Sequence, residues 1–382
     1  MKSRTVLHIL NGEAFSGVEQ VVITLCRHLD PERYRPHVIT LFDGLTAQRV
    51  RDLGFSVEIV PMKSRWDLRP VHRIRNICKQ KNAEILHVHT VRSHLLGALA
   101  ARKLHIPVAV HIHSVAIQET ERRLRNVWNA FIESRLQRWS DCYIVVSNSL
   151  RKYLVLRGIP EMKIRTLLNA IDIQEVKKTS QGMNPPIRER LKLDSNVKLI
   201  GMVAQFQYRK GPEDLLRAVK IIGNEPTPFH LVMIGRGKKL PGGGSYLDGL
   251  KQLTQELGIS HQVTYVGFQE NPLQWMAGLD IFVLPSRFGE GLPMVVLEAM
   301  ALGIPVIATP VEGTAEVLTN DVTGLLPPPE NPEALAEAIV TLLVDPSKGK
   351  TMTEEAGKVV QERHNAPLHA KRMMEIYDEL LE

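Results

Sequence analysis

The stretch from Asp280 to Thr309 constrains the fold more than any other part of this sequence. Its pattern predicts a buried strand at Ile281 to Leu284, a loop containing two glycines, a helix from about Leu292 to Leu302, and a second strand from Pro305. Such a strand-helix-strand unit is typical of a parallel sheet, and its loop lies at the carboxyl end of a strand, where open α/β sheets bind their ligands. The loop is therefore the first place to look for a functional site.

Two carboxylates stand out in this unit, Glu290 in the loop and Glu298 in the helix. Eight residues along a helix would separate them by about 12 Å, which is wider than the carboxylate pairs of glycoside hydrolases. We therefore interpret them as two separate acceptors of hydrogen bonds from ligand hydroxyl groups. The alternative is structural, with Glu290 a solvated loop residue and Glu298 the partner of a buried donor.

The alternation of strands and helices continues along the chain. A chain of 382 residues is too long for one ordinary domain, so two domains are expected. Strands of the second domain begin at Leu199 to Ala204, after a polar, proline-containing segment. This alternation predicts an α/β fold with parallel, doubly wound sheets. The strands expected in the first half are Val6–Leu10, Pro36–Leu41, Ser56–Val60, Ile85–His89, Pro107–His113 and Cys142–Val146.

The segment FGEGLPMVVLEAMALGIPVIAT, with its Glu-x7-Glu spacing, resembles the signature of the retaining, nucleotide-sugar-dependent glycosyltransferases of GT-B architecture. Its closest likeness is the large bacterial family of the family 4 type, the glycosyl transferases group 1, and the resemblance extends over nearly the whole chain. It implies two Rossmann-like domains facing across a cleft. We place an acceptor-side domain at residues 1–172, a linker at 173–196, a nucleotide-sugar-binding domain at 197–364, and a helix at 365–382 that crosses back to the first domain.

The turn after the first strand, NGEAFSGVEQ, combines glycine with the start of a helix, which is an anion site on physical grounds. Any fold of this class contains such turns, so the turn alone is weak evidence. The resemblance places a Gly-Gly-x-Glu pattern here, near the donor pyrophosphate and the acceptor. Gly17 and Glu19 match that pattern, whereas Ser16 replaces its first glycine.

Histidines end two successive strands, His87 and His89 on one, His111 and His113 on the next. Alternate residues of a strand point to the same face, so each pair could bind a metal. No carboxylate or cysteine stands beside them in ligand spacing, and we expect no metal site. Strand ends line the ligand crevice, and the resemblance puts a histidine beside the transferred sugar, matched by His113 with His111 the near alternative. A histidine bonded to a loop carbonyl is the structural alternative.

Basic residues start the first helix of the second domain, where Arg209 and Lys210 precede Gly211. A departing nucleoside diphosphate gains charge that must be neutralised, and the sequence contains no Asp-x-Asp metal clamp. The family motif Gly-Arg-Leu-x3-Lys-Gly holds the pyrophosphate with its Arg and Lys. Lys210 matches that Lys, Gln205 occupies the Arg position, and Arg209 is the candidate replacement. A solvated pair of cations at a helix start is the alternative.

The resemblance then implies a role for each position. Glu298 accepts hydrogen bonds from ribose hydroxyls, and Glu290 contacts hydroxyls of the donor sugar. Lys210 and Arg209 stabilise the diphosphate, and His113 orients the sugar. The remaining donor-side positions are Gly17, Glu19, Gln205, Gly267 beside the nucleobase, and the backbone of Phe288, Gly289, Gly291 and Leu292.

The expected function is therefore retaining transfer of a sugar from a nucleotide-sugar to a hydroxyl acceptor, which could be lipid-linked, in bacterial cell-surface polysaccharide or glycolipid synthesis. A UDP-sugar is favoured over a GDP-sugar, and neither a metal nor another cofactor is expected. The alternatives are a sugar-nucleotide 2-epimerase of the same fold, a transferase acting on a small soluble acceptor, and a non-catalytic binder of sugar nucleotides.

Charge is uneven along the chain. Residues 1–170 carry 27 Lys and Arg against 14 Asp and Glu, a net charge of +13, whereas residues 171–382 carry 21 against 27, a net charge of −6. The first half should therefore meet something anionic. The basic helical stretches Leu68–Lys81 and Glu119–Trp139 could lie on an anionic membrane surface, or could pack on their own sheet with the arginines in water. Nucleic acid is not expected, because no binding motif accompanies the charge.

The compartment follows from what the sequence lacks. Three scattered cysteines, Cys26, Cys78 and Cys142, indicate reducing conditions. No cleavage site follows the short apolar start, so no signal peptide is expected. The weakly charged run Gly291 to Val311 contains Glu298 and three prolines, which argues against a membrane span. We expect a cytoplasmic protein, at most at the inner face of the membrane.

Overall fold

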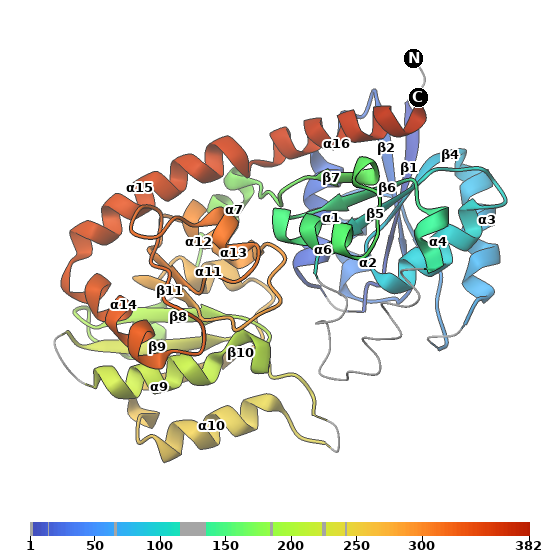
Figure 1. Ribbon diagram of the computed structural model, residues 1–382. Helices are drawn as coiled ribbons and strands as arrows, with labels where there is room; N and C mark the ends of the chain where they lie inside the picture. Colours follow the sequence, from blue (N-terminus) through green and yellow to red (C-terminus); the bar gives the residue numbers. More distant parts are fainter. Residues whose placement is uncertain are drawn as a thin grey trace. The chain divides into compact units, whose positions relative to one another are not determined.

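The computed structural model describes residues 3–13, 15–64, 67–114, 135–183, 186–223, 227–240 and 243–382. The chain divides into two compact units: in Figure 1 the first is coloured from blue to green and includes the dark red C-terminal helix, and the second runs from light green to orange-red. The first unit contains Met1–Ala170 and Asn365–Glu382, and the second contains Ile171–His364. The segment 173–196, expected as a linker, contains two short helices at Ile173–Thr179 and Ile187–Arg190, and its residues are grouped with the second unit.

The first unit is built on a seven-stranded sheet in which every pairing is parallel. The strands lie in the order β3-β2-β1-β4-β5-β6-β7, so the order reverses between β1 and β4. Their apolar runs are buried on both faces, as parallel sheets require. The strands are β1 (Arg4–Leu10), β2 (Tyr34–Thr40), β3 (Val57–Ile59), β4 (Ala83–Val88), β5 (Val108–Ile112), β6 (Cys142–Val145) and β7 (Ile164–Thr166).

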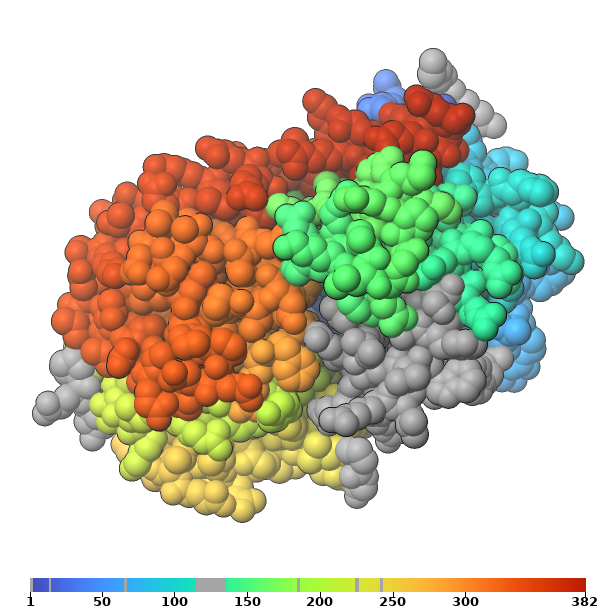
Figure 2. Space-filling view, viewed as in Figure 1, coloured from blue at the N-terminus to red at the C-terminus, as the bar shows by residue number. Residues whose placement is uncertain are grey.

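Helices connect these strands and cover the sheet. The last helix, α16, packs its apolar face, including Met373 and Tyr377, on the same core as residues of β1, β4, β5 and β6. Its other face stays at the surface, as the dark red helix in Figure 2 shows. The helices are α1 (Gly17–His28), α2 (Leu45–Asp52), α3 (Arg69–Lys81), α4 (Val91–Ala101), α6 (Asn148–Leu156) and α16 (Ala366–Leu381), with 3-10 turns at Gln137–Trp139 and Glu161–Lys163.

The second unit contains a smaller, five-stranded parallel sheet, ordered β10-β9-β8-β11-β12. Here the strand order reverses between β8 and β11. The strands are β8 (Lys198–Val203), β9 (Phe229–Ile234), β10 (Val263–Gly267), β11 (Ile281–Leu284) and β12 (Val306–Ala308). The predicted unit of strand, loop, helix and strand therefore forms β11, α12 (Met294–Ala301) and β12.

Helices cover both faces of the second sheet (Figure 1). Apolar residues of α9, α10 and α14 share one core with the strands, whereas α12 contacts α7 and α15. The α/β class with parallel, doubly wound sheets is thereby confirmed. The helices are α7 (Ile173–Thr179), α8 (Ile187–Arg190), α9 (Pro212–Ile222), α10 (Tyr246–Glu256), α11 (Pro272–Met276), α12, α13 (Thr314–Val317), α14 (Pro332–Val344) and α15 (Pro346–Arg363), with 3-10 turns at Tyr208–Lys210 and Ser260–Gln262.

Candidate functional site

In the second unit, a cluster of charged residues lies where the strand order reverses. Lys210 follows β8, and Glu290 follows β11, the two strands on either side of the reversal. Because these strands are parallel neighbours, their carboxyl ends lie at one edge of the sheet, which is where open α/β sheets bind ligands. The topology thus brings together two loops that are separated by about eighty residues of sequence.

Glu290 is the centre of this cluster. Its side chain is 6% exposed and pairs with Lys210 Nζ, and the Ser286 hydroxyl donates to the same carboxylate oxygen at 2.5 Å. Burial would raise the pKa of Glu290, but Lys210 and Arg209 beside it hold that pKa below its ordinary value. Burial lowers the pKa of Lys210, and the attraction of Glu290 opposes that effect. The pair therefore remains charged, and the interpretation of Glu290 as a solvated loop residue is wrong.

Arg209 joins the same cluster from the 3-10 turn after β8. Its Nη1 donates to the carbonyl oxygen of Gly289 at 2.9 Å and lies 3.9 Å from a carboxylate oxygen of Glu290. Gln205, at the position of the family's arginine, is exposed. Arg209 therefore supplies a second cation beside Lys210, and the loop carbonyl holds it there.

The glycine loop after β11 has a backbone arranged to receive an anion. Gly289 has a φ of +79°, and the N–H groups of Gly289 and Glu290 both donate to one carboxylate oxygen of Glu312, at 2.9 and 3.1 Å. Glu312 itself has a φ of 36°, a conformation that non-glycine residues rarely adopt and that tends to mark functional sites. The carboxylate of Glu312 therefore accepts a hydrogen bond from the N–H of Gly289. The sequence analysis had assigned the backbone of Gly289 to ligand binding.

The loop after β12 packs tightly against this glycine loop. Gly313 N–H donates to the carbonyl oxygen of Glu290 at 3.0 Å. A Cβ on Gly313 would lie 1.6 Å from the carbonyl oxygen of Gly291, so only glycine fits there. Leu292 is buried and Phe288 is half-buried beside them. The sequence analysis missed Ser286 and Glu312, whose only signal was their position directly after a predicted strand.

Glu298 lies in α12 and, unlike Glu290, has no partner among the described residues. Its side chain is half-buried, and burial raises its pKa to about 7. Among the residues that the structure describes, none forms a hydrogen bond or ion pair with its carboxyl group. The alternative in which Glu298 satisfies a buried donor finds no such donor in the described residues. Its two oxygens are available to a ligand.

Gly267 ends β10 with a φ of +80°. Its carbonyl oxygen accepts a hydrogen bond from the N–H of Gly235 at 2.8 Å, which ties the ends of β9 and β10 together. A Cβ on Gly235 would lie 1.9 Å from the carbonyl oxygen of Ala204, so the ends of β8 and β9 also approach closely. The strand ends that should border a nucleobase are therefore fixed by backbone contacts.

In the first unit, Gly17 and Glu19 begin α1. The carboxylate of Glu19 is buried and accepts hydrogen bonds from the N–H of Ser16 at 3.0 Å and from its hydroxyl at 2.5 Å. Burial raises the pKa of Glu19. Ser16 departs from the family pattern and Glu19 matches that pattern, and the two residues are hydrogen-bonded to each other.

The structure gathers the four predicted histidines, and it adds His8 of β1. His89 Nδ1 lies 3.3 Å from His113 Nε2, and His89 Nε2 lies 3.2 Å from His8 Nδ1. Burial lowers the pKa of His113 to about 3, so its ring is neutral and bonds another histidine instead of a loop carbonyl. The sequence analysis missed His8, although its place in the first strand, beside the strand of His87, was a usable signal.

The basic surface of the first unit is described only in part. In α3, Ile74 and Cys78 are buried while Arg69, Arg73 and Lys79 are exposed, so this helix packs on its own sheet and presents a basic face. The second basic stretch, Glu119–Trp139, lies outside the described residues up to position 134. The three cysteines are buried free thiols. Among the described helices, none has the length and apolar character to cross a membrane.

Comparison with known proteins gives matches to both halves. Residues 15–175 match the family described as Glycosyltransferase Family 4, and residues 183–359 match the family described as Glycosyl transferases group 1. The chain is 26% identical to the N-acetyl-alpha-D-glucosaminyl L-malate synthase of Bacillus anthracis, over 83% of this chain and 80% of that one. It is 23% identical to the UDP-Gal:alpha-D-GlcNAc-diphosphoundecaprenol alpha-1,3-galactosyltransferase of Escherichia coli, over 89% and 88%.

Solved structures give the same architecture. HepE of Anabaena, crystallised with UDP and glucose, matches with a TM-score of 0.85 at 21% identity, over 98% of this chain and 100% of that one. Sucrose-phosphate synthase of Thermosynechococcus elongatus matches with a TM-score of 0.82 at 22% identity, over 99% of each chain. At these identities the likeness establishes the two-domain GT-B fold.

Proposed function

This chain belongs to the glycosyltransferases of the group 1 and family 4 type, and on that premise we propose the reaction and the roles of its residues. The protein transfers a sugar from a nucleotide-sugar to a hydroxyl acceptor, with retention of the anomeric configuration and without a metal at the diphosphate. A UDP-sugar is the favoured donor and a GDP-sugar the second choice. No cofactor is needed, because the nucleotide-sugar is itself the substrate.

The observation that carries this proposal is the charged cluster of Arg209, Lys210 and Glu290 at the strand reversal of the second sheet. A lysine ammonium has three N–H donors, and Glu290 occupies one of them. The others are available to diphosphate oxygens, whose charge grows as the sugar leaves and is stabilised by fixed cations. Glu290 in turn keeps lone pairs for hydroxyls of the donor sugar. Lys210 and Arg209 thus do the work that a divalent cation does in other transferases.

Glu298 completes the donor site in this proposal. Its half-buried, unpartnered carboxyl suits the two hydroxyls of a ribose, which donate best to an ionised acceptor. Because the pKa of Glu298 is raised to about 7, the carboxyl is only partly ionised near neutral pH. Hydrogen bonds from the ribose stabilise its charged form and lower that pKa. Nucleotide binding and ionisation of Glu298 should therefore be coupled.

The other predicted positions take supporting roles. The backbone of the loop from Phe288 to Leu292 holds sugar or phosphate, and its N–H groups become available to the donor if the carboxylate of Glu312 moves away. Gly267 borders the nucleobase. In the first unit, neutral His113 orients the sugar, and Gly17 and Glu19 lie at the turn for pyrophosphate and acceptor.

The acceptor is proposed to be lipid-linked, in cell-surface polysaccharide or glycolipid synthesis, with the protein cytoplasmic at the inner face of the membrane. The net charge of +13 over residues 1–170 and the basic face of α3 support an encounter with an anionic bilayer. The diphosphoundecaprenol in the name of the relative from Escherichia coli supports the same class. The relative named N-acetyl-alpha-D-glucosaminyl L-malate synthase supports a small soluble acceptor as the alternative.

The donor site is tested by thermal denaturation with UDP, GDP, ADP and dTDP and their sugars, each with and without EDTA. A ligand that binds only the folded state adds about 2.7 kcal/mol of stability at a hundredfold excess over its Kd. One nucleotide class should raise the midpoint by the same amount in EDTA. Glu298→Gln should reduce that gain to about 0.4–1.4 kcal/mol, the value for 10- to 100-fold weaker binding, whereas Glu354→Gln, an exposed glutamate of α15, should keep it in full. A rise that EDTA removes, or that Glu298→Gln leaves intact, contradicts the proposed site.

Transfer and retention need a second measurement. The purified protein is incubated with the stabilising nucleotide-sugar and detergent extracts of bacterial lipid-linked sugars, and the new linkage is read by NMR. An α-linked product from an α-linked donor supports a retaining transferase. A changed sugar nucleotide formed with no acceptor present would identify a 2-epimerase instead.

A further inference from the structure

The centre of the first sheet carries histidine side chains on three neighbouring strands. His8 lies on β1, His87 and His89 lie at the end of β4, and His111 and His113 lie at the end of β5. The register of β1 and β4 places His8 opposite His87. The first four rings are buried, each no more than 3% exposed. Neutral polar rings are thus collected where a sheet of this kind usually packs aliphatic side chains.

Several of these ring nitrogens have no hydrogen-bond partner among the described residues. They are His8 Nε2, His87 Nε2 and both nitrogens of His111. A buried polar atom left unpaired costs about 1–3 kcal/mol, and a bound water or ion is one of the ways in which folded proteins satisfy such an atom. The interior of this sheet therefore holds several imidazole nitrogens that no described residue satisfies, and one of them, His87 Nε2, faces no other partner in the triad discussed next.

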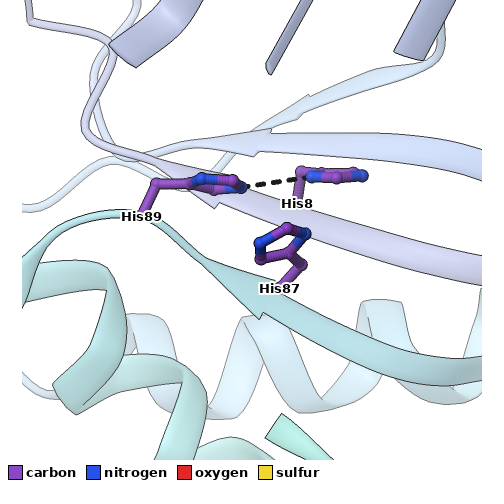
Figure 3. Close-up of side chains that lie close together, drawn as sticks. All are labelled: His8, His87 and His89. Carbon is purple, nitrogen blue, oxygen red and sulfur yellow. Dashed lines mark hydrogen bonds between the residues drawn. The ribbon is translucent and has the colours of Figure 1, made fainter. Parts of the chain in front are cut away.

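Three of the histidines converge as metal ligands do. Figure 3 shows the rings of His89 and His8 edge to edge, with the ring of His87 beside the gap between them. His8 Nδ1 and His89 Nε2 are hydrogen-bonded to each other at 3.2 Å, a contact that a shared metal would replace, and one nitrogen of each of the three rings lies within 4.8 Å of the others. Two nitrogens at about 2.0–2.1 Å from a tetrahedral zinc ion are about 3.3 Å apart. The third ring has at most about 1.5 Å to move.

We propose that His8, His87 and His89 form a binding site for a divalent transition metal ion, best suited to Zn²⁺, which joins β1 to β4 inside the first unit. Three imidazoles favour Zn²⁺, Co²⁺, Ni²⁺ or Cu²⁺ over Mg²⁺ and Ca²⁺. A water or hydroxide takes the fourth position, as in other three-histidine zinc sites. This proposal goes beyond the transfer reaction: the metal stabilises the fold of the first unit.

The surroundings of His87 support a ligand role. The hydroxyl of Tyr377 in α16 lies 2.7 Å from His87 Nδ1. With a metal on Nε2, the proton of His87 is on Nδ1 and is donated to the Tyr377 oxygen, which is how metal-bound histidines are usually oriented.

His89 belongs to a second triad with His111 and His113, which also meets the distance condition. We assign the metal to the first triad because all three of its rings are buried and because Tyr377 orients one of them. The sequence alone argued against a metal, since it showed only pairs of histidines within single strands. His8 of the neighbouring strand completes the set.

The test is a titration of the full chain, purified without a histidine tag and stripped with EDTA, with Co²⁺ as the probe. A tetrahedral site gives a strong visible d–d absorption that saturates at one Co²⁺ per chain and that Zn²⁺ then displaces. This spectrum shows whether the unmodified protein has a tetrahedral metal site. Absence of the band, or binding in several weak steps, means that the histidines form a metal-free polar core, and the proposal is overturned.

Variants locate the site. His8→Gln removes a ligand and should weaken Co²⁺ binding by about 100-fold or more. Tyr377→Phe keeps the ring and removes only the hydroxyl that orients His87, so it should weaken binding by about 10- to 100-fold. His94→Gln is the matched control, because His94 is equally buried in the same unit but bonds Ser140 at 2.7 Å. If His8→Gln does not fold, Tyr377→Phe still distinguishes the first triad. If His8→Gln folds, and if both His8→Gln and Tyr377→Phe bind Co²⁺ as tightly as the wild type does, the first triad is not the metal site.

This site and the proposed donor site can fail independently. The donor site contains no metal, so EDTA should lower the stability of the protein without changing how much a nucleotide adds to it. Loss of the nucleotide effect in EDTA would count against the metal-free donor site. A Co²⁺ spectrum that is absent while nucleotides still stabilise the protein would count against the metal site alone.

Discussion

The two units have the same kind of sheet and place their polar residues at the same topological point, yet the chemistry there is opposite. In the second unit, the loops after β8 and β11 bring Lys210 and Glu290 together as a compensated ion pair. In the first unit, β1 and β4 bring His8 and His87 together as neutral rings with unpaired nitrogens. The charges come from loops in one case, and the neutral rings come from the strands themselves in the other.

This difference indicates what each centre is suited to hold. A loop can move a charged side chain from its partner to a ligand, so the pair of Lys210 and Glu290 suits a substrate that comes and goes. Side chains on buried strands cannot follow a ligand without moving the sheet, and they suit a permanently bound ion. Burial imposes a free-energy cost in both places unless a buried charge is paired and a buried neutral nitrogen is hydrogen-bonded or bound to a metal.

The largest expected effect is on the ion pair of the second unit. Lys210→Met should reduce kcat/KM for transfer by about 100- to 1,000-fold, because a fixed cation no longer stabilises the departing diphosphate. It should also lower the free energy of unfolding by about 3 kcal/mol, because Glu290 is left as an unpaired buried charge. Steady-state kinetics and urea unfolding measure the two effects.

The double variant Lys210→Met, Glu290→Gln separates stability from function. It should recover most of the unfolding free energy, since no charge is left unpaired, and none of the transfer rate. Lys220→Met, at an exposed position of α9, is the matched control and should change neither. Wild-type kinetics in Lys210→Met would remove the ion pair from the mechanism and with it the contrast between the units.

The next effect in size concerns Glu298, the unpaired carboxyl of the second unit. Its pKa is about 7 in the folded protein and near 4.3 in an unfolded chain, so the folded state binds the extra proton between these values. The protonated form therefore supports stability in acid, and that contribution is lost as pH rises through about 7. Above pH 7 the buried charge should cost roughly 2 kcal/mol, after allowance for its partial exposure.

Glu298→Gln should accordingly be more stable than the wild type near pH 8, and the difference should shrink as pH falls and vanish below the unfolded pKa of about 4.3, by urea unfolding at each pH. The same variant should bind the nucleotide about 10- to 100-fold more weakly, the value of one or two hydrogen bonds to a charged group. A stability difference that does not change with pH would show that Glu298 already has a partner.

Ligands should sharpen the comparison by stabilising one unit at a time. Zn²⁺ at a hundredfold excess over its Kd should add about 2.7 kcal/mol, and a nucleotide should add the same amount in the other unit. Hydrogen exchange measured by mass spectrometry locates the effect. Zn²⁺ should slow exchange in β1 and β4, and the nucleotide should slow it around β8 and β11. Slowing by Zn²⁺ in the second unit instead would reverse the assignment.

The fold was predictable from the sequence because its signals are local. Apolar strand runs such as Ile281–Leu284, glycine turns and helix starts can each be recognised within a few residues. The site was predictable where a residue type stands at the end of a strand, as with Lys210 and Glu290. The partner of a residue depends on which strands are neighbours, and that information is absent from local pattern. Hence Glu312, which binds the glycine loop, and His8, which completes the histidine triad, were both missed.

The smallest expected effect tests the turn at the start of α1. Ser16 gives its N–H and hydroxyl to the carboxylate of Glu19, and Ser16→Gly restores the family's residue while removing the hydroxyl. Glycine also adds backbone freedom to the unfolded chain, so the loss should be about 0.5–1 kcal/mol by urea unfolding. Ser149→Gly, within the first turn of α6, gives the cost of glycine near a helix start.

The effect of Ser16→Gly on catalysis, although small, tests whether the first unit contacts the nucleotide-sugar. If the turn holds the donor pyrophosphate, freeing Glu19 from Ser16 should change the KM for the nucleotide-sugar, whereas a purely structural pair should change stability alone. An unchanged KM with a lower unfolding free energy would leave the first unit as a fold held by buried polar bonds. The charged residues that act in transfer would then lie in the second unit. The point of strand reversal would have a structural role in the first unit and a catalytic role in the second.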